Sequence, residues 1–471
     1  MGVTISVLNG CRKPLTSPSS YYHRRSVSLL CPNVISENRD QPRVSSKAVN
    51  QDYDTILIGG GPAGASASAV LSEHGHRVLV LEREKFPRYH IGESLLPFTF
   101  GPLERLGMIA KMRRSCFVKK YSASFVQPDG SSSAPFYFFN RYDRETVAQT
   151  WQVLRSEFDQ MLLDNAREKG AEVREETTVN RLLMDGERVI GVEATDKSGR
   201  IYEVRAPITL DCSGKDAFTS TRRGWRVSDP YLNKIAVWTY YSGSQRETGL
   251  DEGTTTVAYV PDKGWFWHIP QHNDMISVGV VAEAKYLTRG GVKDLRAIFE
   301  RAVEENQWIK ARLATGHGTG QYFITSEYSR HSRHCAAPGL LLLGDAFAFL
   351  DPIFSSGVMM ALKSGVLAGD TIHEGLLKGD LSPGCFTDYG AQLRQGVENM
   401  RKLVYAFYNP DFSFKTVISR YPQAADLITD CLSGDVNKDF SQLWAWIGEF
   451  VKLPEDLPYG EPLLEEVSLA H

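Results

Sequence analysis

Three of the four glycines in residues 59–64, namely Gly59, Gly61 and Gly64, have the spacing of a dinucleotide-binding turn. An apolar run over 53–59 precedes them, and a second apolar run ends at Glu82, 23 positions after Gly59. In such a turn the glycines permit a tight bend, let backbone N–H groups approach a pyrophosphate, and let strand and helix pack closely. An acid at the position of Glu82 accepts hydrogen bonds from a ribose. The predicted dinucleotide contacts are Gly59, Gly61, Pro62, Ala63, Gly64, Glu82 and Arg83.

Two further charged residues stand where they could bind the same cofactor. Asp345 follows the apolar run 340–344, which places a carboxylate at the end of a strand beside Gly344. Such an acid can bind a sugar-alcohol hydroxyl. Arg155 lies in a helical pattern over 151–170, where a helix would lean over the cofactor.

Two tryptophans and a serine–glycine turn add a second kind of chemistry. Side chains alternate along a strand, so Trp265, Trp267 and Ile269 in the segment 264–270 share one face. The segment 349–357 ends in a Ser-Ser-Gly turn that opens a helix. The N–H groups of such a turn offer a site to a small anion or to a cofactor oxygen. The residues singled out here are Pro352, Ser356 and Gly357 of this segment and Val358, which follows it.

Two adjacent lysines, Lys119 and Lys120, lie in a segment with strand character. Neighbours on a strand face opposite sides, so only one of the two can point toward a cavity. An ammonium group beside an electron-rich ring could hold an oxidant by a hydrogen bond.

Taken together these motifs resemble the flavin-dependent halogenases, especially those that act on phenols and pyrroles, within the FAD-dependent monooxygenase superfamily. The similarity runs from about residue 53 to 375. It includes the loop Gly92-Glu93-Ser94, the pattern W-x-W-x-I-P at 265–270 and F-x-x-P-x-x-S-x-G at 349–357. The resemblance implies that the cofactor is FAD, that Glu93 and Ser94 lie along its ring, and that Ser356 and Gly357 bind halide. It also selects Lys120 as the catalytic lysine, and assigns to Trp265 and Trp267 the shielding of substrate from flavin.

The activity implied by this resemblance begins when reduced FAD and oxygen form a flavin hydroperoxide. Halide attack releases hypohalous acid, which halogenates an electron-rich aromatic substrate held near Lys120. The sequence shows no second glycine-rich turn that could bind a pyridine nucleotide, which implies a separate flavin reductase or other electron donor. Three alternatives stay open: a monooxygenase or dehydrogenase, a reductase of isoprenoid substrates like geranylgeranyl reductase, and an FAD-binding protein without catalytic activity.

The predicted strands and helices that carry these residues indicate an α/β fold. We expect a Rossmann-type FAD-binding domain over 51–384, built from segments 53–115, 151–215 and 335–384. An antiparallel β-sheet substrate domain, from 116–150 and 216–334, is inserted into it, and 385–471 form a helical C-terminal region. Residues 204–211 are expected to be a single strand.

The first 50 of the 471 residues differ in composition from the rest. They hold seven Lys or Arg and two Asp or Glu, whereas the other residues hold 46 and 54. A basic, hydroxyl-rich leader is typical of a transit peptide, which predicts import into the chloroplast or, as the alternative, the mitochondrion. The net charge of −3 argues against a nucleic-acid partner. No apolar run reaches the roughly 20 residues that span a bilayer, and the cysteine spacing predicts no metal site.

Overall fold

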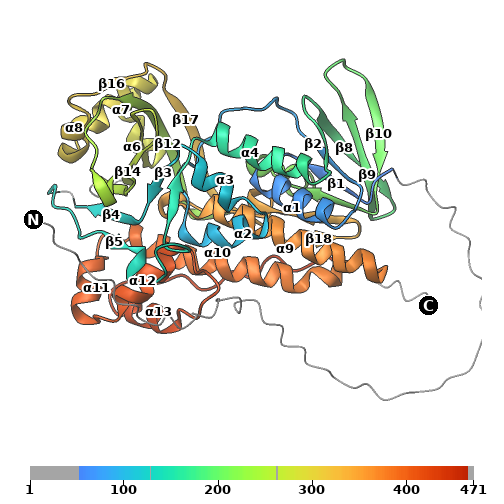
Figure 1. The fold of residues 1–471 in the computed structure, drawn as a ribbon. Coiled ribbons are helices and arrows are strands. Elements are labelled where there is room, and N and C mark those ends of the chain that lie inside the picture. The colour runs from blue at the N-terminus through green and yellow to red at the C-terminus, as the bar shows by residue number, and fades with distance from the viewer. Residues whose placement is uncertain (1–51, 128, 261–263, 465–471) are drawn as a thin grey trace, which may run out of the picture. The chain divides into compact units, whose positions relative to one another are not determined.

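The structure is a computed structural model that describes residues 52–127, 129–260 and 264–464. The predicted transit peptide, residues 1–50, lies outside the described residues. In the described part of the chain no helix combines the length and apolar character needed to cross a membrane. Figure 1 shows the described elements coloured along the chain.

A mainly parallel sheet forms the nucleotide-binding half of the fold. Its strand order is β18-β19-β11-β1-β2-β7, and the pairs among β19, β11, β1, β2 and β7 are parallel. These strands are β1 (Thr55–Ile58), β2 (Val78–Leu81), β7 (Glu172–Arg174), β11 (Ile208–Asp211), β18 (Ala336–Ala337) and β19 (Leu340–Leu342). The helices α1 (Pro62–Glu73), α4 (Arg155–Glu168) and α9 (Ser356–Lys378) pack beside the sheet (Figure 1). The predicted Rossmann-type unit is confirmed.

The expected single strand over 204–211 is wrong. The chain instead leaves a small antiparallel sheet and enters the parallel one within that stretch, at Pro207. Proline has no N–H to give to a sheet ladder and so suits this junction. The small sheet consists of β8 (Thr178–Asp185), β9 (Arg188–Thr195) and β10 (Ile201–Arg205).

The helical pattern expected from residue 151 begins later. Trp151 belongs to strand β6 (Thr150–Gln152), which pairs with β3 (Val118–Lys120), and α4 starts only at Arg155. Two short helices, α2 (Phe100–Arg105) and α3 (Ile109–Arg114), precede this pair, and α5 (Phe218–Arg222) follows strand β11.

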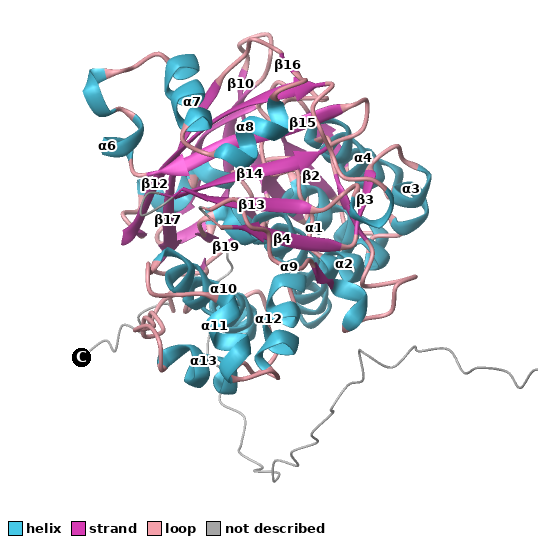
Figure 2. Ribbon diagram, turned by 90° about the vertical axis from the view of Figure 1, so that its left-hand side faces the viewer, coloured by secondary structure: helices cyan, strands magenta, loops and turns pink. Residues whose placement is uncertain are grey.

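A large, mostly antiparallel sheet forms the inserted half, as predicted. Its main path is β20-β17-β12-β15-β14-β13-β4-β5, and β16 pairs with β12. In chain order the strands are β4 (Ser122–Val126), β5 (Phe136–Tyr137), β12 (Arg226–Ser242), β13 (Thr255–Val260), β14 (Gly264–Pro270), β15 (Met275–Ala282), β16 (His317–Gly318), β17 (Phe323–Ser332) and β20 (Ala348–Phe349). Figure 2 shows the central strands side by side.

The two faces of this sheet have separate apolar cores. Phe266 packs with Val237 and Phe299 in a core that the helices α6 (Ala284–Leu287), α7 (Leu295–Glu304) and α8 (Gln307–Leu313) complete. Trp265 and Trp267 belong to the larger core on the other face. The alternation predicted for this strand is therefore confirmed, and the tryptophans face the nucleotide-binding half.

The C-terminal region is helical, as predicted. It comprises α10 (Thr387–Tyr408), α11 (Phe414–Arg420), α12 (Ala424–Ser433) and α13 (Ser441–Gly448), which Figure 2 shows gathered below the large sheet. Phe407 of α10 stacks on Tyr259 of β13, with ring centroids 4.5 Å apart. The helices thus share one core with the sheet face that carries the tryptophans.

Candidate active site

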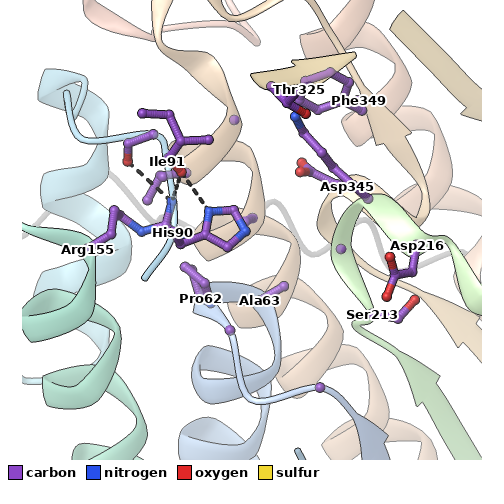
Figure 3. Close-up of a pocket in the computed structure, with 18 of the residues that line it drawn as sticks. Pro62, Ala63, His90, Ile91, Arg155, Ser213, Asp216, Thr325, Asp345 and Phe349 are labelled. Carbon is purple, nitrogen blue, oxygen red and sulfur yellow. Dashed lines mark hydrogen bonds between the residues drawn. The ribbon is translucent and has the colours of Figure 1, made fainter. Parts of the chain in front are cut away.

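A cavity of about 540 Å³ lies at the carboxyl ends of β1, β2, β11 and β19. In open α/β sheets this edge is where ligands bind. Figure 3 shows side chains from both halves of the fold turned toward it. Most of the residues predicted from the sequence line it: Gly59, Gly61, Pro62, Ala63, Glu82, Arg83, Glu93, Ser94, Arg155, Trp265, Trp267, Asp345, Pro352, Gly357 and Val358. Gly64, Lys120 and Ser356 are not among the lining residues.

The glycine turn requires glycine for two measurable reasons. A Cβ on Gly64 would lie 2.0 Å from the carbonyl oxygen of Gly59, so helix α1 could not pack against the turn. Gly59 itself has a φ of +104°, which side chains disfavour. The N–H of Gly60 donates to Oε2 of Glu82 over 2.7 Å, so the carboxylate also fixes the shape of the turn.

Arg155 holds the loop on the opposite side of the cavity. Its guanidinium makes two hydrogen bonds to the buried Asp159, of 2.7 and 2.8 Å. It also donates to the carbonyl oxygens of Ile91, over 2.7 Å, and Gly92, over 3.2 Å. Figure 3 shows the Arg155–Ile91 bond beside the ring of His90. The ion pair satisfies the buried charge, so Arg155 can fix the backbone just before Glu93.

His90 is a neutral side chain within the cavity wall. Burial lowers its pKa to about 3, and its Nδ1 lies 2.6 Å from the carbonyl oxygen of Ile91. A carbonyl only accepts, so Nδ1 carries the hydrogen and Nε2 is the acceptor of the ring. The sequence motifs assigned no role to His90.

Asp345 places a carboxyl group with a raised pKa in the cavity wall. Burial raises its pKa to about 6, against the opposing effect of Lys215 and Arg155. The hydrogen bonds of the described residues include none to this carboxyl. Across the cavity, Arg83 forms an ion pair with Asp216, and the side chains of both are about half exposed. The two predicted contacts thus differ, because Asp345 is partly buried and Arg83 lies toward solvent.

The tryptophans form one wall, and a third tryptophan joins them. Trp238 of β12 also lines the cavity, with its ring centroid 6.1 Å from that of Trp267. Gly279 makes room for the pair, because a Cβ there would lie 2.4 Å from the Trp267 ring. Sequence reasoning missed Trp238, although its strand has the same alternation as the one that carries Trp265.

A hydrogen-bond chain from the C-terminal region orients Trp265. Its indole Nε1 donates to the hydroxyl of Tyr408 over 2.8 Å, and that hydroxyl donates to Oδ2 of Asp351 over 2.8 Å. Asp351 precedes the Pro352 that lines the cavity. Helix α10 therefore links the tryptophan wall to the serine–glycine turn.

In the serine–glycine turn the cavity is lined by Ser355 and Gly357, and the side chain of Ser356 is buried. Ser355 has a φ of +57° and directly precedes α9, so the positive end of this long helix opens toward the cavity. A Cβ on Gly357 would meet no atom within 4 Å, which leaves space for a ligand beside the backbone.

Lys120 is buried and Lys119 is exposed, so the strand separates the two lysines as its alternation requires. The Lys120 side chain is 1% exposed, and burial lowers its pKa to about 7. Its ammonium donates to Oγ of Ser94 over 2.9 Å and to the carbonyl oxygen of Leu95 over 3.1 Å. Since Ser94 lines the cavity, a single hydroxyl connects the lysine to the cavity wall.

Comparison with known proteins identifies the family. The sequence model of tryptophan halogenases matches residues 140–416, and that of FAD dependent oxidoreductases matches residues 54–218. The chain belongs to the flavin-dependent halogenase family. It is 28% identical over 409 residues to the 1H-pyrrole-2-carbonyl-[peptidyl-carrier protein] chlorinase of Pseudomonas fluorescens, covering 82% of this chain and 90% of the relative. The corresponding brominase of Pseudoalteromonas luteoviolacea is 31% identical, with 69% of this chain and 78% of the relative covered.

Solved halogenase structures share the fold. The flavin-dependent brominase Bmp2 superposes with a TM-score of 0.76 at 28% identity, over 84% of this chain and 97% of that one. The myxobacterial chondrochloren halogenase CndH gives 0.71 at 31% identity, over 84% and 95%. The expected halogenase resemblance and the prediction of an FAD-dependent oxidoreductase are confirmed.

The cavity of this halogenase family member fits FAD. The glycine turn presents backbone N–H groups and leaves no room for a Cβ at Gly64, as a pyrophosphate cradle requires. The carboxylates of Glu82 and Asp345 would hold the ribose and ribityl hydroxyls of FAD, and the open space at Gly357 would admit its ring system. FAD is therefore the cofactor, and the tryptophans line the cavity that would hold it.

Proposed function

We propose that this protein halogenates an electron-rich aromatic compound by means of hypohalous acid. The observation that carries the proposal is the position of Lys120, a buried ammonium joined to the wall of the FAD cavity through one hydroxyl, that of Ser94. This arrangement suits a small oxidant that forms in the FAD cavity and reacts beside Lys120. The organic substrate then does not need to contact the flavin. When bound, reduced FAD together with oxygen supplies the oxidising equivalents for the halide.

The residues of the chain perform the remaining steps. The N–H groups at the start of α9, beside Ser355 and Gly357, hold the halide, favoured by the helix dipole. Trp265 and Trp267 keep the organic substrate away from the cavity. The Lys120 ammonium donates a hydrogen bond to hypohalous acid and orients its halogen toward the substrate ring.

The relatives indicate the class of substrate. The chlorinase and brominase named above act on a pyrrole carbonyl group attached to a carrier protein, according to their names. We therefore propose a phenol or pyrrole for this chain in preference to the isoprenoid that the sequence left open. A separate flavin reductase is the proposed source of reduced FAD.

The proposal is tested by mass spectrometry of products. Purified protein with FAD, a flavin reductase, oxygen and bromide is given a panel of phenols and pyrroles, with parallel reactions that lack bromide. We expect brominated products, and a loss on the order of 100-fold or more in Lys120→Ala. Lys119→Ala is the matched control and retains activity. A hydroxylated product that forms without bromide would instead identify a monooxygenase.

We also propose that the leader directs the protein to the chloroplast. The proposal rests on the seven basic and two acidic residues of positions 1–50 and on their many hydroxyl side chains. A fluorescent protein fused to residues 1–50 and expressed in plant cells should accumulate in chloroplasts. Accumulation in mitochondria would support the alternative compartment.

A further inference from the structure

Two tyrosines connect a buried carboxyl group of the cavity to the protein surface. Tyr240 donates its hydroxyl to Oε1 of Glu93 over 2.8 Å, and the hydroxyls of Tyr240 and Tyr89 lie 2.9 Å apart. Glu93 lines the cavity yet is 2% exposed, whereas Tyr89 is 47% exposed. The three side chains therefore span the distance from solvent to the cavity wall.

The indole of Trp238 sets the direction of this chain. Its Nε1 donates to the hydroxyl oxygen of Tyr89 over 2.6 Å. Because an indole N–H only donates, Tyr89 can pass its own hydrogen on to Tyr240, which in turn donates to Glu93. Every hydrogen in the series then points inward, toward the carboxyl group.

Packing holds the chain in this geometry. The ring of Phe323 stacks on those of both Tyr89 and Trp238, with centroid distances of 4.8 and 5.5 Å. Burial raises the pKa of Glu93. Burial also raises the pKa of Tyr89, to about 12. Burial also raises the pKa of Tyr240. The phenols thus stay neutral at physiological pH, as hydroxyls that relay protons must.

We propose that Tyr89, Tyr240 and Glu93 form a proton relay that supplies the proton consumed in making hypohalous acid. The inference rests on the proposed function. Halide, oxygen and reduced flavin (FADH2) yield hypohalous acid, water and FAD only if one proton is taken up, since oxygen accepts two electrons from the flavin and two from the halide. One oxygen atom leaves in hypohalous acid and the other in water.

Each step of the relay balances. A hydronium ion at the surface gives a proton to the hydroxyl oxygen of Tyr89, whose own hydrogen passes to Tyr240, and that of Tyr240 passes to Glu93. The carboxylate becomes a carboxylic acid and both phenols are restored as neutral hydroxyls. Glu93 then gives its proton to the oxygen atom that leaves as water. The positive charge of Arg155 favours the carboxylate form of Glu93. It therefore favours the loss of the proton that returns Glu93 to its starting state.

The relay is tested first in the protein without FAD, by infrared spectroscopy. A light-released proton should protonate Glu93, which gives a carboxylic acid band that is missing in Glu93→Gln. Tyr240→Phe and Tyr89→Phe should delay the appearance of this band about tenfold or more. Tyr241→Phe is the matched control, because Tyr241 is the next residue of β12 and packs on the opposite face, against Phe299. A band that appears as fast in Tyr240→Phe as in Tyr241→Phe would overturn the relay.

The second measurement is the formation of hypohalous acid in a single turnover, trapped with a reporter dye. Tyr240→Phe should slow this step about tenfold or more, increase its solvent deuterium isotope effect, and recover part of the rate with small weak acids. Equal rates in Tyr240→Phe and Tyr241→Phe would contradict the role in turnover. If the wild type makes no hypohalous acid while the infrared delay holds, the proposed function fails and the relay as a proton path stands.

Discussion

The surroundings of the FAD cavity and those of Lys120 differ in how ready they are for a ligand. The cavity is open, with backbone turned toward it at Gly59 and Gly357 and with the carboxyl of Asp345 available. Lys120 is instead 1% exposed, hydrogen-bonded to Ser94 and 5.6 Å from the ring of Phe138. The cofactor region is therefore preformed, whereas the region of the lysine is packed and must rearrange to admit an aromatic substrate.

This difference indicates how the fold separates two reactions. Backbone geometry and buried charges build the cofactor region, so it persists without its ligand. The lysine region is stabilised by the burial of aromatic side chains, whereas its one buried amine lowers the stability. Predictions that perturb one region and leave the other intact can sharpen or break this comparison.

The largest effect is expected from Gly64→Ala. The new Cβ would lie 2.0 Å from the carbonyl oxygen of Gly59, so the turn must shift, and FAD affinity should fall on the order of 100-fold. Absorbance of bound flavin and isothermal titration measure it. The control is Gly101→Ala, where a Cβ meets no atom within 4 Å. Unchanged FAD affinity in Gly64→Ala would mean that the turn adapts and is not preformed.

The next effect concerns stability near Lys120. Burial lowers its pKa from 10.5 to about 7, so the unfolded state binds more protons than the folded state between those values. The free energy of unfolding should therefore gain a contribution that rises with pH from about 7 to 10, a few kcal/mol at about 1.4 kcal/mol per pKa unit.

Lys120→Met should remove this rise and stabilise the protein at pH 7, whereas Lys119→Met should leave the pH dependence unchanged. Urea unfolding at a series of pH values measures both variants. A rise of the same size in Lys120→Met and in the wild type would contradict the burial of a strained amine at this position.

A smaller effect is expected at Asp345. Its pKa of about 6 means that the carboxylate, the better acceptor for a ribityl hydroxyl, is lost as the pH falls through 6. FAD affinity should weaken between pH 7 and pH 5, and Asp345→Asn should weaken it about tenfold at pH 7 and abolish this pH dependence. Fluorescence titration of FAD measures both. An identical pH profile in Asp345→Asn would assign the dependence to another group.

The smallest effect is expected at Gly279, in the tryptophan wall. A methyl group there would lie 2.4 Å from the ring of Trp267, which must turn aside. Gly279→Ala should change the tryptophan fluorescence and raise the share of hydroxylated over halogenated product a few-fold, with FAD affinity kept. A product ratio equal to that of the wild type would contradict the shielding role of the wall.

Local rules were enough for much of the site. The glycine spacing determined the turn at 59–64, and strand alternation determined that Trp265 and Trp267 share a face and that Lys119 and Lys120 do not. The same rules were insufficient for the junction at Pro207, where a strand pattern runs on through a change of sheet. A hydrophobic pattern indicates that a strand is buried, but it does not indicate to which sheet the strand belongs.

The sequence by itself determined the dinucleotide fold, the family and the types of residue that do chemistry, because these follow from short spacings along the chain. Only the tertiary structure decided that Ser355 rather than Ser356 lines the cavity, that Trp238 joins the wall, and that Tyr408 orients Trp265. It alone joined Tyr89 and Tyr240 to Glu93. Such contacts bring together residues up to 151 positions apart, and local propensities do not encode the packing that aligns them.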